Sequence, residues 1–93
     1  MVLERAEIEV KPGHEDAFDA LRHEAMQLLE ACPGCRSARI MRGIENPGKF
    51  LFLVEWDSVE AHAAAKPGDS FVKFGGLIYP HTQSGSMDHY TVD

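Results

Sequence analysis

Residues 49–56, with the sequence KFLFLVEW, restrict the fold of this chain more than any other segment. In a β-strand, alternate side chains point to opposite faces of the sheet. Four large apolar side chains share one face: Phe50, Phe52, Val54 and Trp56. Leu51 and Leu53 point to the other face. A sheet with one face in water alternates apolar and polar residues, so this strand predicts that both faces of its sheet are covered.

The length of the chain limits what can provide this cover. Its 93 residues correspond to one domain, which we place over residues 1–93. A domain of this size buries only about 60–65% of the surface that its unfolded chain exposes. A second copy of the chain is the simplest cover, so we expect a homodimer. The alternative is a two-layer monomer with some exposed apolar side chains.

The charge balance argues against two classes of partner. The formal net charge is -6, and the Lys and Arg residues are scattered along the chain. An acidic surface repels phosphate backbones and anionic membrane surfaces, so we expect no nucleic-acid and no membrane partner. No segment approaches the ~20 apolar residues of a membrane span. Acidic residues near the start argue against a signal peptide, so a cytoplasmic location is expected.

Hydrophobic periodicity divides the first half of the chain into three elements. Residues 2–10 alternate as a strand does, and residues 14–31 carry apolar residues at the three- and four-residue spacing of an amphipathic helix. Residues 35–43 form a second strand candidate. The turn signal Asn46-Pro47-Gly48 joins it to residues 49–56 as a hairpin.

The second half of the chain predicts helical pieces and a last strand. Asp57–Glu60 resembles a capping box that opens a short helix. A further helical piece follows, capped by Asp69 or Ser70 and weakened by Gly75-Gly76. A polar loop after residues 79–81 leads into a strand over residues 86–92. The order predicts an α+β fold of the ferredoxin-like β-α-β-β-α-β plan, with a four-stranded antiparallel sheet.

Several short segments resemble the antibiotic biosynthesis monooxygenase domain family, in the dimeric α/β-barrel group. The segments that carry the resemblance are Val10–Gly13, Cys32–Cys35, Val54–Ser58, Glu60–His62, Ser70–Phe71 with Phe74, and Asp88–Tyr90. The resemblance implies a homodimer whose two sheets face each other, with a small apolar pocket in each protomer. Characterised members oxidise polycyclic phenols or quinols with molecular oxygen and use no metal or flavin, while others degrade haem.

Three functions follow from this resemblance. We expect a cofactor-independent monooxygenase that oxidises a small phenolic, quinol or polyketide-like aromatic. The first alternative is a non-catalytic dimer that binds a small hydrophobic ligand. The second is haem degradation, for which the family uses an asparagine in the first strand and a histidine in the helix after the tryptophan strand. The first strand here has no asparagine, and residues 71–78 contain no histidine.

The reaction implied by the resemblance needs a base, hydrogen-bond donors and aromatic walls. His89 is the candidate base and Trp56 the candidate wall and donor, although a structural histidine and a core tryptophan are the simpler interpretations. The candidate substrate-binding residues are Phe52, Arg39, His62, Phe74 and Tyr79. For His62 and for His81 solvation is the favoured interpretation, and for Arg39 a surface charge pair is favoured.

Cys32-Pro33-Gly34-Cys35 has the spacing of redox and zinc motifs. The pair follows the C-terminus of a predicted helix, where the helix dipole opposes a thiolate. No second Cys or His pair offers further zinc ligands. We therefore expect neither redox activity nor a metal site at these cysteines.

Overall fold

The structure is a computed structural model that describes residues 1–92. The elements are β1 (Val2–Val10), α1 (Glu15–Glu30), β2 (Cys35–Arg42), β3 (Lys49–Trp56), α2 (Val59–Ala65), α3 (Asp69–Ile78), a 3-10 turn (Tyr79–His81) and β4 (Thr82–Thr91). The four strands form one sheet in the order β2-β3-β1-β4, and each neighbouring pair is antiparallel. The predicted ferredoxin-like α+β fold is confirmed.

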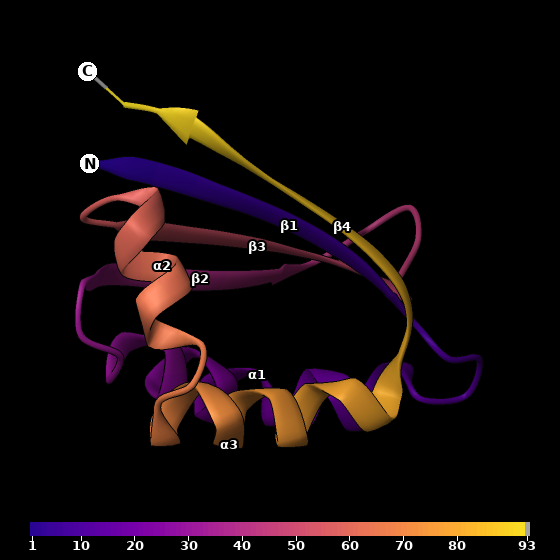
Figure 1. Cartoon of the computed structure of the whole chain (residues 1–93). Coiled ribbons are helices and arrows are strands. Elements are labelled where there is room, and N and C mark those ends of the chain that lie inside the picture. The colour runs from indigo at the N-terminus through magenta and orange to yellow at the C-terminus, as the bar shows by residue number, and fades with distance from the viewer. Residues whose placement is uncertain (93) are drawn as a thin grey trace.

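The helices lie on one side of this sheet (Figure 1). Strand β3 directs its alternate residues into the space between the sheet and the helices, and all four are buried: Phe50, Phe52, Val54 and Trp56. The ring of Phe18 from α1 lies 4.5 Å from the ring of Phe50, centroid to centroid. Burial of these side chains is the main stabilising term of the fold, at about 1.5–3 kcal/mol for each.

The starts of α3 and of β4 differ from the sequence prediction. Helix α3 itself runs through Gly75-Gly76, and Phe74 and Ile78 bury its inner side in the core. Its N-cap is Gly68 rather than Asp69 or Ser70. Strand β4 begins at Thr82 instead of residue 86, since it pairs with β1 as far as Val10. Tertiary pairing therefore overrides the low strand propensity of this glycine- and serine-rich segment.

The first turn of α2 is close to the predicted capping box. The cap is Ser58 rather than Asp57, because the Ser58 hydroxyl oxygen accepts the backbone N–H of Ala61 at 3.0 Å. This bond satisfies one of the free N–H groups at the start of the helix. It fixes the position of His62, which lies one residue further along the helix.

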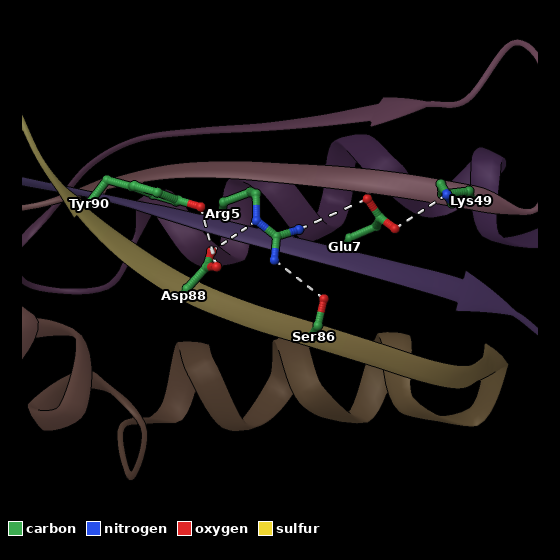
Figure 2. Close-up of polar contacts among 6 residues, drawn as sticks. All are labelled: Arg5, Glu7, Lys49, Ser86, Asp88 and Tyr90. Atoms are coloured by element: carbon green, nitrogen blue, oxygen red, sulfur yellow. Dashed lines mark hydrogen bonds and ion pairs between the residues drawn. The ribbon is translucent and has the colours of Figure 1, made fainter.

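The face of the sheet that points away from the helices carries both apolar and charged side chains. Leu51 and Leu53 are half-buried on it. Figure 2 shows a connected polar group on the same face, in which the Arg5 guanidinium contacts Asp88 at 2.8 Å and Glu7 at 3.9 Å. The Arg5 contact lowers the pKa of the Asp88 carboxyl. None of the helices within residues 1–92 has the length and apolar character needed to cross a membrane.

Candidate functional site

A cavity of about 690 Å³ lies between α3 and the half of the sheet formed by β1 and β4. Its apolar walls include Ala6, Ile8, Phe52, Phe71, Phe74 and Ile78. Glu4, His62 and Lys66 supply ionisable groups to its lining. Ligand sites in proteins are typically cavities of about 300–1,000 Å³ with mostly apolar walls and a few polar groups. The size and lining of this cavity suit a small aromatic molecule.

Two adjacent glycines of α3 shape one wall of the cavity. A Cβ atom added at Gly75 would lie 2.8 Å from Cε2 of Tyr79, so the Tyr79 ring packs directly on this backbone. A Cβ atom at Gly76 would meet nothing within 4 Å. A larger side chain at the exposed Gly76 would therefore extend into open space.

Glu4 is a buried carboxyl in the lining of the cavity. Its residue is 8% exposed, and the indole N–H of Trp56 donates to its Oε1 at 2.9 Å. Burial raises the pKa of the Glu4 carboxyl, and the Trp56 hydrogen bond opposes this shift in part. The sequence prediction missed Glu4. The available signal was its place in β1, where it shares the inward face with Val2 and Ala6.

His62 is buried between Trp56 and the cavity. The solvated interpretation of His62 is wrong: the residue is 3% exposed, and its ring stacks on Trp56 at 4.6 Å with an interplanar angle of 12°. Its Nδ1 lies 2.8 Å from Nε2 of His89, and its Nε2 lies 3.5 Å from Oε1 of Glu4. Burial, with the nearby His89 and Lys66, lowers the pKa of His62 to about 4. The imidazole is therefore neutral at neutral pH.

Most of the predicted site residues lie at this cavity, in two layers. Phe52, His62, Phe74 and Tyr79 line it. Trp56 and His89 lie behind the lining and reach it through Glu4 and His62. The candidate base His89 is thus placed one side chain away from the ligand space.

Arg39 is placed elsewhere. It is exposed and pairs in register with Leu53, on the face of the sheet that points away from the cavity. Arg42 lies on the opposite face of β2 and contacts Asp16 at 3.2 Å. Neither guanidinium lines the cavity.

Two further side-chain groups of the sequence prediction lie outside the cavity lining. His81 is half-buried and not simply solvated, because its Nδ1 lies 3.0 Å from Nδ1 of His14. Burial raises the pKa of Cys35 to about 11 and also raises that of Cys32, which disfavours thiolates. Within residues 1–92, no three His, Cys, Asp or Glu side chains are grouped as a metal site.

Comparisons of sequence and of structure relate this chain to one protein family. The sequence profile of the family described as antibiotic biosynthesis monooxygenase matches residues 1–75. The uncharacterized protein YczJ of Bacillus subtilis is 30% identical over 92 residues, which cover 97% of each chain. A structure from Bordetella bronchiseptica, assigned as an antibiotic biosynthesis monooxygenase, is 26% identical with a TM-score of 0.87 and covers 99% of this chain and 96% of that one.

A second solved structure, named antibiotic biosynthesis monooxygenase, is 23% identical with a TM-score of 0.84. The match covers 100% of this chain and 99% of that one, and at this identity it supports the fold alone. The profile match extends over most of the chain, from β1 into α3. It therefore includes Glu4, Trp56 and His62. The chain belongs to the antibiotic biosynthesis monooxygenase family.

Proposed function

We propose that this protein is a monooxygenase that oxidises a small phenolic, quinol or polyketide-like aromatic with molecular oxygen and without a metal or flavin. The observation that carries the proposal is the apolar cavity of about 690 Å³ with a buried carboxyl and a neutral imidazole in its lining. Membership of the family and the monooxygenase name of the similar structures support the same general role.

The chemistry needs an electron-rich ring held away from water. Removal of a proton from a phenolic hydroxyl supplies the electron density that oxygen requires. Insertion then forms a new carbonyl on the ring from one oxygen atom, and the other oxygen atom leaves as water. The two hydrogens of that water come from the substrate, so the reaction needs no external reductant. Phe52 and Phe74 supply flat walls that orient a ring.

The side chains behind the lining have a supporting role in this proposal. Trp56 is fully buried, donates to Glu4 and stacks on His62. Nε2 of His89 lies 2.8 Å from Nδ1 of His62. These contacts hold the polar groups of the cavity in fixed positions, which is how a preorganised site lowers the cost of reaction.

Oxygen uptake with a panel of hydroquinones and polycyclic phenols tests this function. We expect the wild type to consume one oxygen molecule for each carbonyl formed, with no added metal. Gly76→Leu adds a bulky side chain at the cavity lining and should lower uptake. Gly76→Ala is the matched control and should retain it. Ligand-dependent thermal stabilisation without any oxygen uptake would instead identify a non-catalytic protein that binds a small hydrophobic ligand.

We also propose that the protein is a homodimer joined through the outer face of the sheet. Leu3, Met41, Leu51 and Leu53 are half-buried on this face. Several charged groups there pair within the chain, as Arg5 does with Asp88 and Lys49 with Glu7 (Figure 2), while Arg39 is exposed beside them. Pairing within the chain lowers the cost of desolvating the paired groups when the face is buried.

Sedimentation at micromolar concentration tests the assembly. We expect twice the chain mass for the wild type and a large loss of dimer for Leu53→Asp. Ile44→Asp is the control, because Ile44 is 87% exposed in the loop before β3 and lies outside the proposed interface. A wild-type monomer at this concentration would contradict the proposal.

A further inference from the structure

The contacts around Glu4 distinguish its two carboxylate oxygens. Trp56 Nε1 lies 2.9 Å from Oε1, and His62 Nε2 lies 3.5 Å from the same atom. Both donors thus approach one oxygen, which leaves Oε2 for a group in the cavity. Glu4 itself belongs to the cavity lining. Within residues 1–92 no side-chain hydrogen bond or ion pair involves Oε2, so this oxygen can accept a hydrogen bond from a ligand hydroxyl.

The contacts of His62 then determine which of its nitrogens carries the proton. A neutral imidazole has one N–H, and His62 is neutral at neutral pH. When Nε2 carries the proton, this N–H faces the Glu4 carboxylate, 3.5 Å from Oε1, and Nδ1 accepts the Nε2–H of His89 at 2.8 Å. This arrangement gives both nitrogens of His62 a neighbouring polar group. The ring plane is fixed in addition by the stack on Trp56.

We propose that Glu4 is the catalytic residue that takes the proton from the ligand hydroxyl through Oε2, and that Trp56, His62 and His89 are positioning residues that hold its carboxylate. This inference rests on the proposed function. In the first step the O–H bond of the ligand breaks and an O–H bond forms on Glu4. In the last step Glu4 returns that proton to the hydroxide that leaves as water, so the carboxylate is restored.

The surroundings of Glu4 suit this task. A carboxylate in water is a weak base, and burial makes the Glu4 carboxylate more basic because it disfavours the charged form. Trp56, His89 and Lys66 act in the opposite direction and keep the ionised form accessible. Glu4 can therefore both accept a proton and release it again.

Anaerobic binding of p-nitrophenol, whose phenolate is seen by absorbance, tests the assignment without any oxidation. One pH unit below the pKa of the free probe, we expect wild type to bind it as the phenolate. Glu4→Gln keeps the shape of the side chain but removes the base. This variant should bind p-nitrophenol in its neutral form, with the ionised fraction of the bound probe lowered about 10-fold or more. 4-Nitrotoluene has no hydroxyl and should bind both proteins equally.

Substitutions of His89 test the positioning role. His89→Leu removes the donor to His62 and should lower the ionised fraction of bound p-nitrophenol. His89→Gln keeps an N–H donor and should restore it. His81→Leu is the matched control, because His81 also contacts a second histidine, His14, but lies away from Glu4. An equal decrease of the ionised fraction in His89→Leu and His89→Gln would overturn the positioning role.

The outcomes separate this inference from the proposed function. Ionisation of bound p-nitrophenol by wild type and not by Glu4→Gln supports the inference even if no substrate consumes oxygen. Ionisation by Glu4→Gln, neutral binding by wild type, or no binding at all would overturn it. In the oxidation of an active substrate, Glu4→Gln should lower kcat by about 10²–10⁴-fold with a much smaller change in KM.

Discussion

The two halves of the sheet differ in what lies beneath them. The first half, called the packed half, consists of β2 and β3 with α1 beneath them. Its side chains fill the space between sheet and helix, and Phe18, Phe50 and Val54 are fully buried. Under β1 and β4, with α3, the hollow half borders the cavity, which is partly open to solvent, and β4 buries no residue. The packed half supplies most of the burial, and the hollow half gives up burial for a ligand space with polar groups in its lining.

The largest expected effect tests this difference directly. Phe50→Ala in the packed half should lower the free energy of unfolding by about 3–5 kcal/mol, because Phe50 is 0% exposed and packs on Phe18. Phe71→Ala in the hollow half should cost less than about 2 kcal/mol, because Phe71 is half-exposed beside a space that is already empty. Urea unfolding measures both. Equal losses would remove the distinction between the halves.

The pH dependence of stability is the next effect in size. The pKa of His62 is about 4 in the folded chain and 6.5 in the unfolded chain, so the unfolded state binds more protons between these values. Stability should therefore fall as the pH falls from 6.5 to 4, by up to about 3 kcal/mol. His62→Gln should lack this part of the loss. The pKa of Glu4 is raised rather than lowered, and Glu4 is present in both wild type and His62→Gln. The difference in pH-dependent stability between these two proteins therefore reports on His62.

Trp56 lies where the two halves meet. Trp56→Phe should lower the free energy of unfolding by an intermediate amount. Phenylalanine keeps a ring against His62 but removes the N–H that satisfies Glu4. The loss of a buried hydrogen bond to a carboxyl costs about 1–3 kcal/mol. In a Glu4→Met background the same substitution should cost clearly less, and denaturant unfolding of the four proteins gives the coupling. Equal costs in both backgrounds would show that the bond contributes nothing.

The smallest effect sharpens the description of α3. Gly76→Ala should raise stability by up to about 1 kcal/mol, because alanine is the better helix former and its Cβ meets open space. Gly75→Ala should gain less, since its Cβ would meet the Tyr79 ring at 2.8 Å. Thermal unfolding compares the two variants. A larger gain at Gly75 would show that the Tyr79 ring does not rest on this backbone in solution.

The packed half was the more predictable from sequence, for a physical reason. Alternation in residues 49–56 depends on burial alone, and all four inward side chains lie where this pattern predicts. Phe52 and Phe74 follow from the same patterns, and both line the cavity.

The hollow half was less predictable, because polar contacts between distant residues leave no periodic signal. Glu4 and His89 meet His62 only once β1, β4 and α2 are assembled, so Glu4 was missed and His62 was expected in solvent. The early start of β4 depends likewise on pairing with β1 rather than on its own residues.

The central position of β1 has a consequence for how a ligand is accommodated. β1 is hydrogen-bonded along both edges, and Glu4 stands opposite Val54 on one side and His89 on the other. Its amides should exchange with deuterium slowly, whereas the outer edge of β4 is free within residues 1–92 and α3 contains two glycines. We therefore expect Glu4 to lie in the stiffest part of the hollow half, whereas α3 and the outer edge of β4 are the parts that can adjust around a bound ligand.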